Sequence, residues 1–142
     1  AYDASVYNAR ILIEAGVVTS LHSDNNEISS RMNWEAGKLL RTGLTHEQAL
    51  STVTNQAAKA VAIDARVGSL EVDKDADFVI WSGNPLSQFT RAEQTWVDGR
   101  RYFSLEEDAA MREQIDRERT QLIQAILSIS GNGDMRDLRG SN

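Results

Sequence analysis

The stretch that decides the fold class is GVVTSLHSD, residues Gly16–Asp24. Val17–Leu21 is a short apolar and β-branched run, which predicts a strand buried in a parallel sheet. Functional groups in such sheets lie just past the carboxyl ends of the strands. Since side chains alternate along a strand, His22 and Asp24 should point to the same side. The stretch therefore predicts an imidazole and a carboxylate at the mouth of an α/β site.

Helical patterns surround this strand. Glycines that stop helices follow two of them, and a T-x-x-Q capping box opens a third. The predicted elements are a helix from about Asp3 to Ala15, a polar loop over Asp24–Ser30, a helix from about Ser30 to Arg41, and a helix that begins at Thr45–Gln48 and continues to Val61.

From Asp64 the pattern changes to short β-type runs. Asp98-Gly99 separates two of them, and this dipeptide supplies the positive φ angles of a tight hairpin turn. We expect a β unit of three or four strands, with the strands at Val67–Val72, Phe78–Trp81, Thr95–Val97 and Arg100–Phe103.

The last predicted element is a long helix from about Leu105 to Ile129. It carries an apolar stripe that we expect to pack against the β unit or a partner helix, and Gly131–Gly133 should end it. The stripe consists of Met111, Ile115, Leu122, Ile126 and Ile129. The predicted segments are 1–63, 64–103 and 104–130, with a flexible tail at 131–142.

Composition limits the function classes. The chain has 142 residues, a net charge of −6 and no cysteine. No cluster of Lys and Arg is present, so nucleic acid is not an expected partner, and no apolar run is long enough for a membrane span. The missing cysteines favour a reducing compartment such as the cytoplasm. Because the chain starts at Ala1 and enters a helical pattern almost at once, we expect a piece of a larger protein.

Each candidate residue also has a structural interpretation. Asp24 could serve only as the N-cap of the next segment, and His22 could be a hydrogen-bonded core histidine. The other histidine, His46, lies in the first turn of a helix and is expected to be solvated. A zinc site needs three or four protein ligands. Any metal site that uses Asp24 therefore takes further ligands from outside this chain.

An ordered series of segments resembles the metal-dependent amidohydrolase superfamily, most closely its imidazolonepropionase-like and dipeptidase-like members. The segments are NWEAGK (Asn33–Lys38), GLTHEQAL (Gly43–Leu50), TVTNQAAK (Thr52–Lys59), VGSLEVDKDADFVIW (Val67–Trp81) and VDGR (Val97–Arg100).

The resemblance implies an α/β fold. This chain would supply the last strand and neighbouring helices of a (β/α)₈ TIM barrel, the C-terminal half of a small β-sandwich, and a long terminal helix. It also implies hydrolysis of C–N bonds in amides, cyclic amides or peptides, with a divalent metal, zinc as the first expectation. Asp24 matches the metal ligand and proton shuttle of the family. We expect substrate contacts from His22 and from the loop beyond it, at Asn25, Asn26 and Glu27.

The chain also departs from the family. The H-x-H pair of the first barrel strand and the later ligands have no counterpart here. The isolated chain is therefore predicted to be inactive, and its partners to be a small-molecule or peptide substrate together with the rest of a parent protein or an oligomer. Two alternatives stay open: a non-catalytic interaction module that binds a partner through the long helix, and one half of a split hydrolase.

Overall fold

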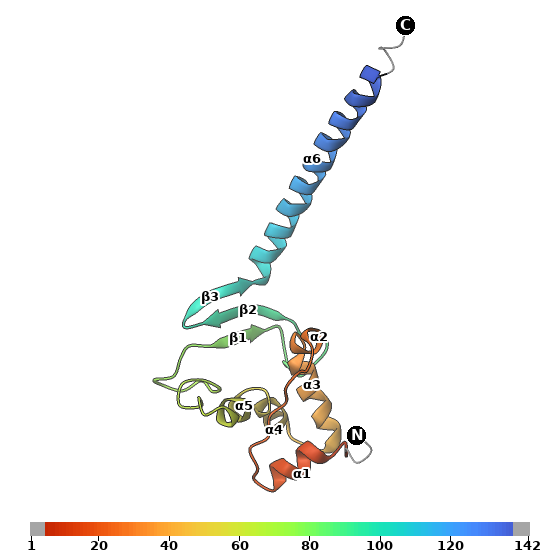
Figure 1. The fold of residues 1–142 in the computed structure, drawn as a ribbon. Coiled ribbons are helices and arrows are strands. Elements are labelled where there is room, and N and C mark those ends of the chain that lie inside the picture. Colours follow the sequence, from red (N-terminus) through yellow and green to blue (C-terminus); the bar gives the residue numbers. More distant parts are fainter. Residues whose placement is uncertain (1–4, 138–142) are drawn as a thin grey trace. The chain divides into compact units, whose positions relative to one another are not determined.

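The computed structural model describes residues 5–137, with side chains described as far as 129 (Figure 1). The chain forms two units, one up to Ser104 and one from Leu105 onward. The first unit is a mixed α/β structure, which confirms the predicted class at this level. Its elements are α1 (Asn8–Glu14), α2 (Asn26–Ser29), α3 (Met32–Lys38), the 3₁₀ helix η1 (Leu39–Thr42), α4 (His46–Ser51), α5 (Asn55–Ala60), β1 (Phe78–Trp81), β2 (Ala92–Val97) and β3 (Arg100–Ser104).

The prediction of a strand at Val17–Leu21 is wrong, because these residues form neither strand nor helix in the structure. The Val17 amide donates to the Leu12 carbonyl (2.9 Å), and the Leu21 amide donates to Thr52 (3.1 Å). A strand exists only where a neighbour continues the hydrogen-bond ladder. Within residues 5–137 no strand pairs with this segment, so it does not become part of a sheet despite its apolar, β-branched sequence.

The start of the third predicted helix is confirmed, and its length is wrong. Thr45 and Gln48 form the capping box, in which the Gln48 amide donates to Thr45 Oγ1 (3.1 Å) and the Thr45 amide donates to Gln48 Oε1 (2.9 Å). The helix then ends at Ser51, and α5 begins at Asn55. Thr52 is fully buried, and its hydroxyl donates to the Ala49 carbonyl (2.7 Å), a local bond that competes with helix continuation.

Other predicted helix limits also shift. The first helix begins at Asn8, after non-helical residues 5–7, while Asp3 lies outside the described residues. The helix expected over Ser30–Arg41 is α3 followed by the 3₁₀ turn η1. The polar loop predicted at Asp24–Ser30 contains the short helix α2. Asn25 begins this helix, because its side chain acts as the N-cap. The polar composition of the segment had favoured a loop instead.

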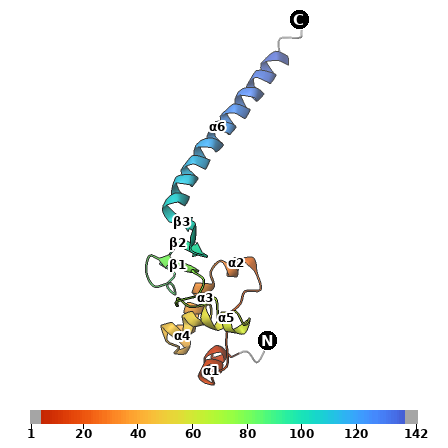
Figure 2. The same ribbon diagram turned by 90° about the vertical axis from the view of Figure 1, so that its left-hand side faces the viewer.

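The β unit is a three-stranded antiparallel sheet in the order β1-β2-β3, and the strands lie side by side in both views (Figures 1 and 2). The predicted hairpin is confirmed: Asp98 and Gly99 have φ angles of 50° and 70°, and Val97 pairs with Arg100. Phe78 and Trp96 stack across β1 and β2, with ring centroids 5.6 Å apart.

The strand predicted at Val67–Val72 is wrong. Gly68 has a φ of +92° and Asp73 a φ of +70°, so the backbone turns at both ends of the segment instead of extending. Such φ values interrupt a strand. The segment forms turns that connect α5 to the sheet.

The core of the first unit consists of small residues. Ala36 of α3 and Ala49 of α4 are fully buried and cluster with Leu86, which follows β1. The backbone of Leu86 approaches Gly37 so closely that a Cβ there would lie 2.5 Å from the Leu86 carbonyl oxygen. Leu21 packs against this core, which fixes the residue directly before His22.

The second unit is the helix α6 (Leu105–Asp137). The predicted helix end at Gly131 is wrong, since α6 continues through both glycines. A glycine costs only about 1 kcal/mol in a helix, much less than a proline. Residues 138–142 of the predicted tail lie outside the described residues. In the part of the chain that the structure describes, no helix combines the length and apolar character needed to cross a membrane.

Candidate functional site

His22 and Asp24 lie together as predicted, although their segment does not form the strand on which that prediction was based. His22 Nδ1 is 3.4 Å from Asp24 Oδ1. Both side chains face solvent, with exposed fractions of 77% and 96%. The residue before them is held in place, because Leu21 packs against the core and donates its amide to the Thr52 carbonyl. An anchored segment thus presents an imidazole and a carboxylate side by side.

The N-cap role considered for Asp24 belongs to its neighbour. Asn25 Oδ1 accepts the Ile28 amide (2.8 Å) and begins α2. The Asp24 carboxylate is not used to start a helix, and its contact in the described structure is with His22. It therefore keeps its oxygen atoms available for a ligand.

The loop residues beyond Asp24 have local contacts. Asn25 caps α2, and Glu27 Oε1 accepts from Arg31 Nη2 at 2.6 Å. The Asn26 carbonyl accepts from the Ser29 hydroxyl (2.7 Å), while its exposed side chain is in the first turn of α2. Contact of Asn25, Asn26 or Glu27 with substrate stays a prediction, and these bonds show that two of the three side chains also shape the loop.

His22 and Asp24 fit two positions of a metal site. Imidazole nitrogen and carboxylate oxygen are ligands that zinc accepts, and two ligands of one tetrahedral zinc lie about 3.3 Å apart. The observed 3.4 Å agrees with that spacing. Among the residues whose side chains the structure describes, 5–129, no group of three or more His, Cys, Asp or Glu side chains converges on a common point. This part of the chain therefore supplies an incomplete ligand set.

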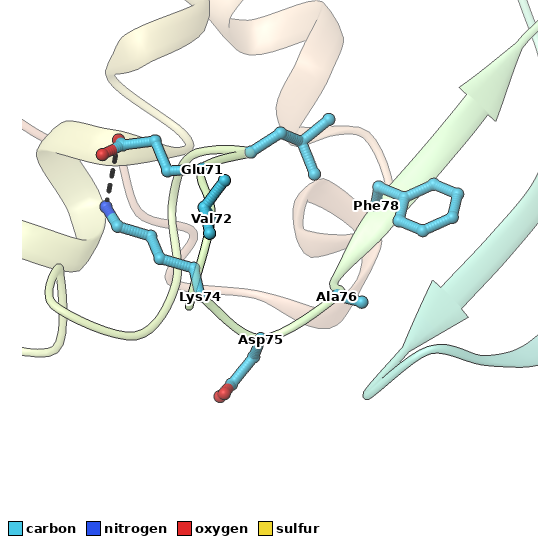
Figure 3. Close-up of a pocket in the computed structure, with 7 residues that line it drawn as sticks. Glu71, Val72, Lys74, Asp75, Ala76 and Phe78 are labelled. Carbon is cyan, nitrogen blue, oxygen red and sulfur yellow. Dashed lines mark hydrogen bonds and ion pairs between the residues drawn. The ribbon is translucent and has the colours of Figure 1, made fainter.

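A shallow hollow lies elsewhere in the first unit, in the segment before β1 (Figure 3). None of the predicted site residues lines it. Its lining residues are Leu70, Glu71, Val72, Lys74, Asp75, Ala76 and Phe78. Figure 3 shows Glu71 and Lys74 turned toward each other, with Asp75 directed away from them.

The polar side of this hollow is a compact network that the strand-like pattern of Val67–Val72 concealed. Lys74 Nζ donates to Ser69 Oγ (2.6 Å), Ser69 Oγ donates to Glu71 Oε1 (2.5 Å), and Lys74 Nζ lies 3.2 Å from the same Glu71 oxygen. The Lys74 side chain is only 16% exposed. The hydrogen bond from Ser69 and the contacts with Lys74 lower the pKa of Glu71 below its ordinary value of 4.5. The network cross-links a turn, and its chemistry is that of structure, not catalysis.

Replacing Glu71 with glutamine should lower the thermal stability of the chain at neutral pH. A carboxylate whose pKa is lower in the folded state stabilises the fold above the unfolded pKa, and this contribution disappears as the pH falls through the folded pKa. Thermal unfolding measured at neutral pH and again at about pH 3, below the usual carboxylate range, should therefore show a gap between wild type and Glu71→Gln that closes in acid. The exposed Glu93 of β2 offers the control Glu93→Gln, for which we expect no such gap. An equal gap at both pH values would contradict the role given to the Glu71 charge.

Comparisons with known proteins point to one family. The model of the amidohydrolase family matches residues 3–102. The amidohydrolase tasK of Hapsidospora irregularis is 30% identical over 104 residues, which are 72% of this chain and 11% of that protein. The imidazolonepropionase of Pseudomonas aeruginosa is 60% identical over 38 residues, 27% of this chain and 10% of that protein.

A solved structure gives the same result for the fold. The crystal structure of an amidohydrolase from Thermotoga maritima superposes with a TM-score of 0.67 and 31% identity, over 72% of this chain and 27% of that one. This chain thus spans about a tenth to a quarter of the length of these relatives. With its family match over residues 3–102, the chain belongs to the amidohydrolase family.

Proposed function

We propose that this chain is part of a metal-dependent hydrolase that cleaves C–N bonds in amides, cyclic amides or peptides. The observation that carries the proposal is the Asp24 carboxylate, which is solvent-facing, free of any capping role and in contact with His22. It follows a core-anchored segment of a chain that belongs to the amidohydrolase family. Relatives are named as amidohydrolases and imidazolonepropionases, which supports C–N hydrolysis as the reaction class.

Asp24 would perform the proton transfers of this reaction. Its carboxylate accepts a proton from the hydrolytic water as that water attacks the carbonyl carbon, and then passes the proton to the leaving nitrogen as the C–N bond breaks. A divalent metal bound at such a site lowers the pKa of its water to about 7. Asp24 would hold it, with zinc as the first expectation and the remaining ligands outside this chain. His22, Asn25, Asn26 and Glu27 are the proposed contacts for a small-molecule or peptide substrate.

The surrounding architecture is part of the same proposal. Val17–Leu21 would become the last strand of a (β/α)₈ barrel once strands from outside this chain continue its ladder, and β1–β3 would form half of a small sandwich. The similarity to the Thermotoga maritima amidohydrolase supports this arrangement. The isolated chain is then inactive, because His22 and Asp24 supply too few ligands for a zinc site. The cytoplasm stays the proposed location.

Removing the metal from the full-length protein tests the reaction class. The protein is purified, its metal content is measured by mass spectrometry, and hydrolysis is assayed on an open-chain amide, a five-membered cyclic amide and a dipeptide. Chelation should abolish hydrolysis and added Zn²⁺ should restore it, while circular dichroism confirms that the chelated protein stays folded. Hydrolysis that persists in protein shown to be free of metal would contradict the proposal.

A further inference from the structure

The helix α6 exposes apolar side chains along its length. They are Met111, Ile115, Leu122, Ile123, Ile126, Leu127 and Ile129. The family match ends at residue 102, so α6 lies beyond it and the proposed hydrolase site does not account for it. An exposed apolar set of this size marks an interaction surface.

Part of this set follows a heptad repeat. Ile115, Leu122 and Ile129 recur every seven residues, and Met111, Glu118 and Ala125 form a second row at the same interval. The two rows alternate at spacings of four and three residues, which is the a and d pattern of a coiled coil. Ile123 and Leu127 fall at the outward b and f positions of the same repeat. We call the two rows together the α6 seam.

We propose that α6 pairs in parallel and in register with α6 of a second copy of this chain. In that arrangement each layer of the seam meets its own copy: isoleucine meets isoleucine at Ile115 and Ile129, and leucine meets leucine at Leu122. Six layers from Met111 to Ile129 then bury the seam, and five of them are apolar.

The charges beside the seam select this occupant. Glu118 is the one charged residue in the six layers, and in a parallel pair a d residue lies beside the following e residue of the other helix. That residue is Arg119. Arg112 and Arg117 already bind Asp108 and Glu113 within their own helix, whereas Arg119 has no ion pair in the part of α6 whose side chains are described. The second copy therefore neutralises Glu118 with an arginine that is otherwise unpaired.

The two directions differ in where they place Glu118. In the parallel pair the two Glu118 carboxylates share one layer, with an Arg119 of the other helix beside each of them, and the other five layers are apolar. In the antiparallel pair each Glu118 faces Leu122, so two layers of the seam carry a charge against an apolar side chain. The parallel direction confines the charge to one layer whose arginines neutralise it.

Mass measurement on the 142-residue chain tests the pairing. Light scattering coupled to size exclusion should give a species of twice the chain mass of 15.8 kDa for the wild type. Leu122→Asp should convert it to a monomer, because two carboxylates would face each other inside the seam. Leu127→Asp is the matched control, because Leu127 has the same side chain, a similar exposure (58% against 65%) and an f position. A monomeric wild type, or equal masses for the two variants, overturns the proposal.

A cysteine cross-link tests the direction. The chain has no cysteine, so an introduced one is unique. Asp108 precedes Ile115 by one heptad, and Asp108→Cys should form a disulfide-linked dimer on mild oxidation, because the two thiols meet only in a parallel pair. In the antiparallel pair they would be on the order of 30 Å apart. Gln124→Cys at an outward c position is the control. No linked dimer from Asp108→Cys, or equal linkage from both variants, overturns the parallel arrangement.

Discussion

Replacing Asp24 with asparagine should reduce kcat of the full-length hydrolase by about 10²–10⁴-fold, the contribution of a positioned general acid–base group. Asparagine keeps the size of the side chain and can still accept a hydrogen bond, but it cannot take up the proton of the hydrolytic water. The Asp24 carboxylate is 96% exposed and has no structural bond to lose beyond its contact with His22. The variant should therefore fold normally, and its bound metal should fall together with its activity.

Asp98→Asn is the matched control for that experiment. It makes the same chemical change at an exposed aspartate, and asparagine tolerates the left-handed φ of 50° that Asp98 adopts in its hairpin. We expect wild-type activity and metal content. Wild-type kcat and metal content in Asp24→Asn would instead favour the non-catalytic interaction module. For a split hydrolase, activity should require a second chain that carries an H-x-H pair and copurifies with this one.

The elements that the sequence predicted correctly are those whose cause is local. The capping box at Thr45 and Gln48 and the hairpin at Asp98-Gly99 each depend on side chains and φ angles within four residues, and both are present. The strand at Val17–Leu21 depends on a neighbour to pair with, which the pattern of one segment cannot reveal. The same limit applies to Thr52, whose burial and hydroxyl bond divide a helix that the apolar spacing makes continuous.

The candidate site also has features that the sequence could predict and features that it could not. The proximity of His22 and Asp24 was predicted from the alternation of a strand that does not form, so the prediction is right for a reason that the structure does not bear out. Whether Asp24 or Asn25 caps the next helix could not be decided in advance, because both residue types are favoured N-caps. The structure assigns that role to Asn25. The network of Ser69, Glu71 and Lys74 was not predicted, because it forms only when the backbone turns at Gly68. The alternating apolar residues around Gly68 favoured a strand at that place.

Gly68 is a position where a single added methyl group should destabilise the first unit. Gly68→Ala should lower the free energy of unfolding by about 2–5 kcal/mol, from the sum of two effects. An alanine at a φ of +92° costs about 1–2 kcal/mol. Its Cβ would also lie 2.7 Å from the Ala58 Cβ and 3.1 Å from the Asn55 Cα, and such overpacking costs about 1–3 kcal/mol. Denaturant unfolding of the chain measures the loss.

Gly16→Ala separates these two effects. Gly16 also has a positive φ (+76°), yet no atom lies within 4 Å of the place where its Cβ would be. This variant should therefore lose only the backbone contribution of about 1–2 kcal/mol. The difference between the two variants then measures the contact of Gly68 with α5.

Removing the methyl group of Ala58 tests the same contact from the other side. Ala58→Gly in the Gly68→Ala background vacates the atom that the new Cβ meets first. The double variant should be more stable than the sum of the two single losses predicts, since residues in contact are not additive. Additive losses would mean that Gly68 and Ala58 are not packed together. The turn after α5 would then owe its shape to the φ angle of Gly68 alone, without a requirement for the close approach of the two segments.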